Sequence, residues 1–303
     1  MSFGPEPDWV RDALRLPFKA EHPRPGEAPI EDSPLTLTSF GDREFFQIVY
    51  SDGSRFLVDG AANRLWGTCP TPLTDEDLAT YLLGPVMGFV LRRRGTIALH
   101  ASSVCLYGKA VVLSGSTESG KSTTAAALAL RAVPVLAEDI SPIREIDEVF
   151  YIEPGYPRIC LWPSAVEALL GRPDALPLLT PTWQKRFLPL DGAPANFEPK
   201  QQPLGAIYLL APRTREARGP RIEELGKREA LLHLVQNTYM NWLLDRTQRG
   251  TELEVLAKLV ERVPVRKLVP HSDPAFIGAL CDLILSDTEQ LLERHSFAGS
   301  SGR

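Results

Sequence analysis

The chain has 303 residues, 44% of them hydrophobic, so it can bury a sizeable core as one large domain or two smaller ones. Its formal net charge is -5, and the lack of an excess of basic residues disfavours general nucleic-acid binding. The four cysteines are far apart and form no C-x-x-C pair, which predicts reduced core residues of a cytoplasmic protein rather than disulfides or a zinc site.

The N-terminal segment, residues 1–34, is rich in proline, and only residues 9–16 could form a short helix. Because proline fixes φ and removes a hydrogen-bond donor, we predict an extended arm over 1–34. Its first residues lack the basic and apolar regions of a signal peptide. The longest apolar run, residues 81–91, is too short to span a bilayer, so we expect a soluble protein with no membrane partner.

Residues 35–94 are predicted to form a small β-rich accessory domain with a linking helix. Residues 45–50 and 55–58 are rich in aromatic and β-branched side chains and flank the sequence SDGS, which is typical of a hairpin turn. The linking helix is expected to begin after Thr74, a capping residue followed by three carboxylates. The Gly84-Pro85 step should kink it.

The strongest motif is GSTESGKS at residues 115–122, which fits G-x-x-x-x-G-K-[ST], the loop that cradles the phosphates of a nucleoside triphosphate. An apolar strand precedes it and an alanine-rich helix follows it, as the chemistry requires. Lys121 would reach the β- and γ-phosphates, and the Ser122 hydroxyl would hold Mg²⁺. The residues predicted to bind the nucleotide are Gly115, Ser116, Thr117, Glu118, Ser119, Gly120, Lys121, Ser122 and Thr123.

The strand before this phosphate loop carries His100, and the two strands are predicted to form a hairpin. If Gly108-Lys109 is a two-residue turn, Tyr107 pairs with Ala110. In that register His100 lies opposite Thr117, beside the loop. A one-residue slip would turn His100 to the other face, so its functional role depends on the register.

An acidic pair follows the helix, because residues 133–137 are apolar and lead into Glu138 and Asp139. A strand that ends in a carboxylate beside a phosphate loop can supply a metal ligand or a contact to the attacking group. Neighbouring side chains alternate along a strand, so one carboxylate can face Mg²⁺ and the other the acceptor hydroxyl.

The remaining sequence predicts further strands and helices. The proline-rich stretch 173–203 contains Lys185 and Arg186, which either contact phosphate or lie on a solvated surface. Residues 229–245 are expected to form one helix with its aromatic side chains in the core. The tail, residues 296–303, is predicted to be flexible.

These motifs together resemble the HPr serine kinases and their relatives. His100, the phosphate loop and the Glu138-Asp139 step occur in the order seen in that family. The resemblance covers about residues 95–285 and extends to HPr-kinase-like proteins found beside peptide-modification genes, among them lasso-peptide kinases. Further matching motifs are LHAS at 99–102, PRICLW at 157–162, KRF at 185–187 and AIYLL at 206–210.

The resemblance implies an α/β fold: a P-loop kinase domain of the HPr-kinase/PEP-carboxykinase type over residues 95–295, with a mixed sheet and flanking helices, after the β-rich N-terminal domain. It implies ATP and Mg²⁺ as cofactors and a serine or other hydroxyl of a peptide or small protein as the acceptor, with a ribosomally made peptide precursor as one candidate. Asp139 would be the catalytic base, tuned by His100, and Lys121 would bind phosphate. Glu138 would act near the metal with Ser122. The cations Arg158, Lys185 and Arg186 are candidate substrate contacts.

Several alternatives stay open. Residues 153–158 stand where HPr-directed members have a glycine-rich acidic sequence, so HPr as acceptor, the reverse phosphorylase reaction and a metal role for Glu153 are undecided. Glu138 replaces an aspartate of those members. An ATP-binding regulatory or scaffold protein and a small-molecule kinase are the competing functions. The sequence also leaves open whether the protein forms a homo-oligomer.

Overall fold

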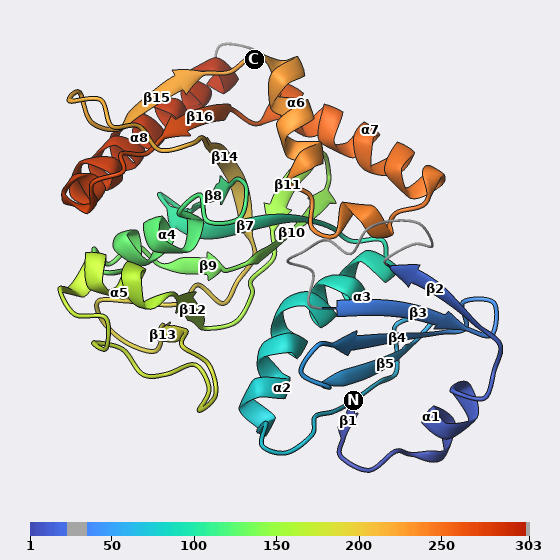
Figure 1. The fold of residues 1–303 in the computed structure, drawn as a ribbon. Helices are drawn as coiled ribbons and strands as arrows, with labels where there is room; N and C mark the ends of the chain where they lie inside the picture. Colours follow the sequence, from blue (N-terminus) through green and yellow to red (C-terminus); the bar gives the residue numbers. More distant parts are fainter. Residues whose placement is uncertain (23–34, 301–303) are drawn as a thin grey trace. The chain divides into compact units, whose positions relative to one another are not determined.

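The computed structural model describes residues 1–22 and 35–300, with side chains described as far as residue 294. The chain divides into two compact units (Figure 1). Unit 1 comprises Met1–Gly95 and the short segment Thr180–Trp183, and unit 2 comprises Thr96–Leu179 and the chain from Gln184 onward.

Unit 1 is built around a mainly antiparallel sheet with the strand order β1, β6, β5, β4, β3, β2. The bounds of these strands are Ser2–Phe3 (β1), Phe18–His22 (β2), Leu35–Phe40 (β3), Phe45–Tyr50 (β4), Arg55–Asp59 (β5) and Leu65–Thr68 (β6). The predicted hairpin is present as β4 and β5, closed by a hydrogen bond from the Tyr50 amide to the Ser54 carbonyl at 2.8 Å. Alternate residues of β4 are buried, so one face of this strand packs on the core.

The extended arm predicted for residues 1–34 is wrong for its described part. Strands β1 and β2 pair with β6 and β3, and helix α1 (Asp8–Ala13) packs Val10 and Ala13 against Leu57 and Trp66. The prolines do not prevent this, because Pro7 lies at the helix N-cap, where its missing amide costs nothing. Residues 23–34 lie outside the described residues.

The linking helix is present in three pieces: α2 (Asp75–Tyr81), a π-helical turn (Leu82–Val86) and α3 (Met87–Arg93). The Thr74 amide donates to Asp77 Oδ2 at 2.8 Å, which completes the predicted cap. The break falls at Gly84-Pro85, as expected, with non-helical dihedral angles at Gly84. Unit 1 also holds Thr180–Trp183, in which Thr182 donates to Asp77 and the Trp183 ring lies 5.4 Å from that of Tyr81.

Unit 2 contains a mixed sheet with the order β11, β10, β7, β8, β14, β16, β15, in which β9 also pairs with β7. Strands β8, β14 and β16 are parallel, and β7 runs antiparallel to β8. The bounds are Ile97–Leu106 (β7), Lys109–Ser114 (β8), Val135–Ala137 (β9), Ile140–Ile146 (β10), Val149–Ile152 (β11), Gln202–Leu210 (β14), Arg221–Glu224 (β15) and Val265–Val269 (β16). A separate pair joins β12 (Arg158–Leu161) to β13 (Arg186–Pro189).

Helices lie on both faces of this sheet (Figure 1). Val111 and Leu113 of β8 pack with α4 (Lys121–Ala129), α5 (Pro163–Leu170) and α8 (Ile277–Ser300). Val112 points to the opposite face, where it packs with α6 (Lys227–Gln236) and α7 (Arg246–Arg262). The helix α8 continues to Ser300, so the tail predicted to be flexible from residue 296 is partly helical.

The hairpin of β7 and β8 turns at Tyr107-Gly108 rather than at Gly108-Lys109. Leu106 pairs with Lys109 and Ala101 with Ser114, so the predicted register is wrong by two residues. A shift of two residues keeps every side chain on its predicted face, because the strand period is two. His100 therefore stays on the expected face beside the phosphate loop.

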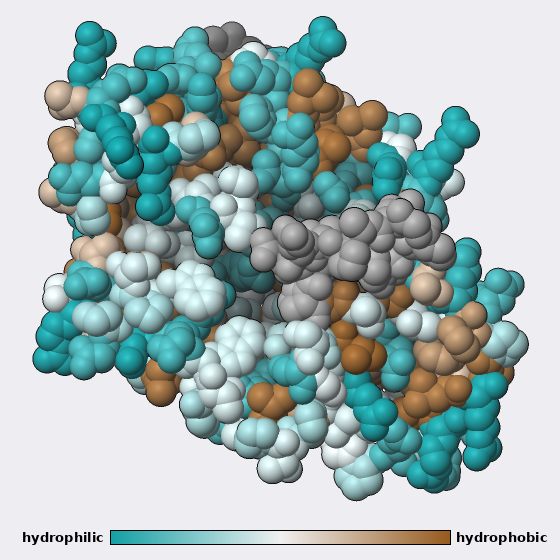
Figure 2. All heavy atoms as spheres, in the orientation of Figure 1, coloured by the Kyte–Doolittle hydropathy of each residue, from teal (hydrophilic) through white to brown (hydrophobic). Residues whose placement is uncertain are grey.

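In the described part of the chain, no helix is long and apolar enough to cross a membrane. The face drawn in Figure 2 shows hydrophilic residues interspersed with hydrophobic ones.

Candidate functional site

The phosphate loop connects the end of β8 to the start of α4. Gly115 and Gly120 have positive φ values of 155° and 105°, a conformation that side chains other than glycine rarely adopt. A Cβ atom at Gly115 would lie 2.9 Å from the Leu210 carbonyl oxygen, so the backbone of β14 leaves no room for one. The glycines thus allow a tight curl that ends at a helix N-terminus, where free amides and the helix dipole favour an anion.

Lys121 is buried inside this curl. Its Nζ donates to the carbonyls of Gly115 at 2.9 Å and Ser116 at 2.8 Å, so the ammonium group lies within the loop. Burial lowers the pKa of Lys121 to about 8. The negative charges of Asp139 and Glu138 act in the opposite direction, but burial has the larger effect. An anion bound in the loop would stabilise the charged form of this lysine.

Ser122 and Glu138 form a direct hydrogen bond. The Ser122 hydroxyl donates to Glu138 Oε1 at 2.9 Å, and Glu138 is only 5% exposed. Burial and then the neighbouring charge of Asp139 raise the pKa of Glu138, whereas the Ser122 hydrogen bond opposes the shift. A hydroxyl and one carboxylate beside a phosphate loop are the protein ligands that Mg²⁺ commonly takes, with phosphate oxygens and water completing its octahedron.

Asp139 lies in the bend between β9 and β10, two strands that both pair with β7. Because Ile140 is the partner of His100 in that ladder, the bend brings His100 Nδ1 to 3.3 Å from Asp139 Oδ1. Burial acts to raise the pKa of Asp139, but the hydrogen bond and charge of His100, with the charges of Lys185 and Lys121, hold it below its ordinary value. The lowered pKa favours the ionised carboxylate. The Asp139 side chain is 31% exposed, so an incoming group can reach it.

Tyr239 was predicted to point inward from a continuous helix; it is buried, but it lies beyond the end of α6 and contacts this pair. The predicted helix 229–245 ends at Gln236, and the chain then pairs with β7. His100 donates its amide to Asn237 O at 2.9 Å, and Tyr239 donates its amide to Ala98 O at 2.8 Å. The Tyr239 hydroxyl is placed 3.4 Å from Asp139 Oδ2, and its ring centroid is 5.8 Å from that of His100.

One sequence signal could have shown this break. Asn237 and Thr238 are poor helix formers directly after the last helical residue, because their side chains compete for backbone hydrogen bonds. The Asn237 side chain makes such a bond, because its Nδ2 donates to the His233 carbonyl at 2.8 Å.

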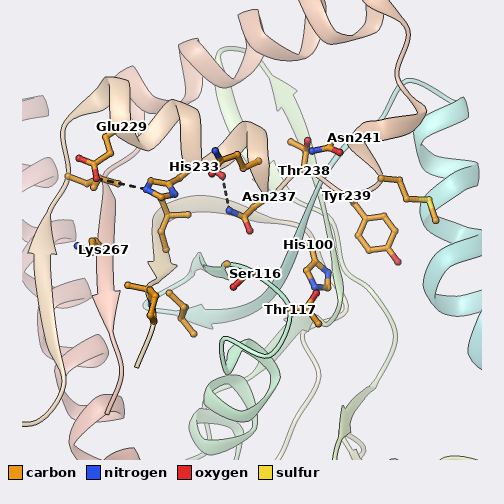
Figure 3. A pocket seen from close by; sticks show the side chains of 18 residues that line it. His100, Ser116, Thr117, Glu229, His233, Asn237, Thr238, Tyr239, Asn241 and Lys267 are labelled. Atoms are coloured by element: carbon orange, nitrogen blue, oxygen red, sulfur yellow. Dashed lines mark hydrogen bonds and ion pairs between the residues drawn. The ribbon is translucent and has the colours of Figure 1, made fainter. Parts of the chain in front are cut away.

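A cavity of about 820 Å³ lies beside the phosphate loop. Figure 3 shows Ser116 and Thr117 on one side of it, with Glu229 and His233 of α6 across from them and His100 at one end. Leu209 and Leu210 at the end of β14 and Lys267 of β16 also line it.

The three predicted substrate cations differ in their surroundings. Lys185 lies 4.9 Å from the Trp162 ring, and its charge lowers the pKa values of both acidic residues of the site. Arg186 instead donates to the Leu176 carbonyl at 2.7 Å. The Arg158 guanidinium lies 5.2 Å from the Tyr156 ring centroid. Of these three cations, Lys185 is the one whose charge acts on the acidic pair.

Glu153, an open candidate for a metal ligand, pairs with Arg144 at 3.3 Å. Within residues 1–22 and 35–300, no group of three or more His, Cys, Asp or Glu side chains is arranged to hold a metal ion by itself. Ser122 and Glu138 remain the residues whose chemistry fits Mg²⁺ bound together with phosphate oxygens. The curled loop and the buried ammonium fit the phosphates of a nucleotide.

Comparisons with known proteins place the chain in no family. Neither a protein-family model nor a curated protein matches the sequence. Among solved structures, the HPr(Ser) kinase/phosphatase from Coxiella burnetii has a similar arrangement with a TM-score of 0.37 and 13% sequence identity. The match covers 68% of this chain and 99% of that chain. A likeness this distant supports no functional conclusion, which therefore depends on the site itself.

Proposed function

We propose that this protein is an ATP-dependent kinase that transfers the γ-phosphate to a hydroxyl group of a peptide or small protein. The observation that carries the proposal is the acidic pair at the phosphate loop. Glu138 accepts from Ser122, the loop residue expected at Mg²⁺, while Asp139 is held by His100. A nucleotide sensor needs the loop and its lysine, but it has no use for a carboxylate held ionised beside them.

Phosphoryl transfer depends on positioning the two reactants and on neutralising the charge of the phosphates, and different residues of the site would supply these functions. ATP would supply the transferable phosphoryl group, and Mg²⁺ would neutralise charge on its phosphates. The loop amides and Lys121 would bind the phosphates, and Ser122 with Glu138 would hold the metal. Asp139 would accept the proton of the acceptor hydroxyl, and His100 would keep that carboxylate ionised and oriented.

The deciding experiment is a transfer assay with γ-labelled Mg-ATP, a panel of serine-containing peptides and a set of small alcohols, read by mass spectrometry. We expect a phosphorylated peptide whose formation depends on Asp139. Phosphorylation of small alcohols alone would favour the small-molecule kinase. Tight ATP binding without any phosphorylated product would favour the regulatory or scaffold protein.

Nucleotide binding should take up protons near pH 8. In the free protein Lys121, with a pKa of about 8, is about half protonated at that pH. Bound phosphate raises this pKa, so binding should take up about half a proton, and affinity should fall as pH rises through 8. Calorimetry of Mg-ATP binding in buffers of different ionisation enthalpy measures the uptake. Lys121→Arg is the control, because a guanidinium stays protonated and should show neither proton uptake nor the fall in affinity. Equal proton uptake by the wild type and this variant would contradict the assignment of the uptake to Lys121.

Replacing His100 should move the pH dependence of turnover. His100→Ala removes the hydrogen bond and charge that lower the pKa of Asp139, so this pKa should rise. The base works only when ionised, so the acid limb of the pH–rate profile should shift to higher pH. The matched control is His271→Ala, whose ring packs 4.1 Å from that of Phe276. Superimposable profiles for wild type and His100→Ala would make His100 a structural strand residue.

A further inference from the structure

The cavity beside the phosphate loop is too large and too well placed to be a packing defect. Its volume of about 820 Å³ lies in the range of small-molecule sites, roughly 300–1,000 Å³. It opens at the carboxyl ends of the parallel strands β8 and β14, because Gly115 follows β8 and Leu210 ends β14; Lys267, in the middle of β16, pairs with Leu209 beside them. Ligands of open α/β sheets bind at this edge.

The phosphate loop forms part of the cavity wall. Gly115, Ser116 and Thr117 belong to both, so a molecule whose phosphates lie in the loop could extend directly into the cavity (Figure 3). The rest of the wall combines two surfaces. Leu209, Leu210 and Pro212 are apolar, whereas Gln236, Asn237 and Asn241 carry amide groups.

Two polar side chains that line the cavity have partners from the protein. His233 Nε2 lies 3.9 Å from Glu229 Oε1 on α6, and Lys267 Nζ lies 2.8 Å from Glu223 Oε2. A cavity with apolar walls and amide side chains suits a flat, uncharged group with hydrogen-bonding edges. The Nδ2 groups of Asn237 and Asn241 donate to backbone carbonyls, so these two residues present their amide oxygens, whereas the Gln236 amide can match both the donor and the acceptor of a nucleobase edge.

We infer that this cavity receives the nucleoside, base and ribose together, of the nucleotide whose phosphates bind the loop. The inference rests on the proposed function for the presence of a nucleotide, but not on phosphoryl transfer. It adds Gln236 and the amide-bearing end of α6 to the binding site. An acceptor side chain is the competing occupant.

The test compares Mg-ATP with Mg-tripolyphosphate, which has the phosphates without the nucleoside. Gln236 is exposed and ends α6, so Gln236→Trp should fold and project a large ring at the cavity. We expect it to weaken ATP binding at least tenfold and to change tripolyphosphate binding less than twofold. Arg228→Trp is the matched control, because this exposed position on the same helix does not line the cavity. It should leave both affinities unchanged.

Each other outcome overturns the inference in a distinct way. Unchanged ATP affinity in Gln236→Trp would place the nucleoside elsewhere, and a raised KM for the acceptor in that variant would assign the cavity to the acceptor. Equal weakening of both ligands would mean that the substitution disturbs the loop. Wild-type protein that binds neither ligand would refute the nucleotide site as well. A protein that behaves as expected here but transfers no phosphate would refute the kinase proposal and leave this inference standing.

Discussion

Lys121→Ala is expected to lose ATP turnover by at least 10²–10³-fold, the cost of removing one preorganised charge from a phosphoryl-transfer site. The ammonium lies inside the loop, 2.9 Å and 2.8 Å from the Gly115 and Ser116 carbonyls, whereas the Arg213 guanidinium contacts the loop at the exposed Glu118 carbonyl, at 3.4 Å. Its removal leaves the phosphates without their positive partner in a buried place, where water compensates poorly.

The fold should survive this change. Burying an ammonium carries a desolvation cost, which is why the pKa of Lys121 is lowered, and alanine is a good helix former at the start of α4. Circular dichroism and thermal unfolding report the fold, and calorimetry with Mg-ATP reports binding. A folded variant with unchanged affinity and turnover would remove the phosphate-loop assignment.

Asp139→Asn should retain nucleotide binding and slow transfer by about 10²–10⁴-fold, because an amide cannot accept the proton of the acceptor hydroxyl. The substitution keeps the size of the side chain and an oxygen that can accept from His100 or Tyr239. It therefore separates the loss of a base from the loss of packing. Single-turnover transfer and Mg-ATP affinity are the two measurements.

The companion variant is Glu138→Gln. Glu138 accepts from Ser122, so this change should weaken metal-dependent nucleotide binding first. If Asp139→Asn instead loses ATP affinity while its residual rate is normal, Asp139 is the metal ligand and Glu138 the base. That result would exchange the two roles within the same site.

Local sequence patterns indicated the centre of the candidate site, because its parts lie close together in the chain. The loop needs only its glycines, the strand before it and the helix after it, all within residues 109–129. The proximity of His100 and Asp139 could be anticipated because both flank this unit on strands that pair. Even the wrong hairpin register kept His100 on the correct face, since the error was a whole strand period.

Long-range pairing explains what the sequence did not predict. Residues 237–239 do not continue α6, because their backbone groups form hydrogen bonds with β7. That strand lies more than a hundred residues earlier in the chain. An amphipathic pattern cannot show such competition, so residues 237–239 were predicted to continue the helix. Strands β1 and β2 were missed for the same reason. They form by pairing with β6 and β3, which the proline-rich composition of their segment does not reveal.

The membership of Thr180–Trp183 in unit 1 makes that unit discontinuous in sequence. The chain leaves unit 1 after Gly95, returns for four residues and leaves again before Lys185. A truncated chain that begins at Thr96 would therefore lack Asp77, the hydrogen-bond partner of Thr182, and Tyr81, the ring partner of Trp183. These contacts lie close in sequence to Lys185, whose charge acts on the acidic pair. The N-terminal unit therefore cannot be removed or replaced as one continuous piece without also changing the partners of this internal segment.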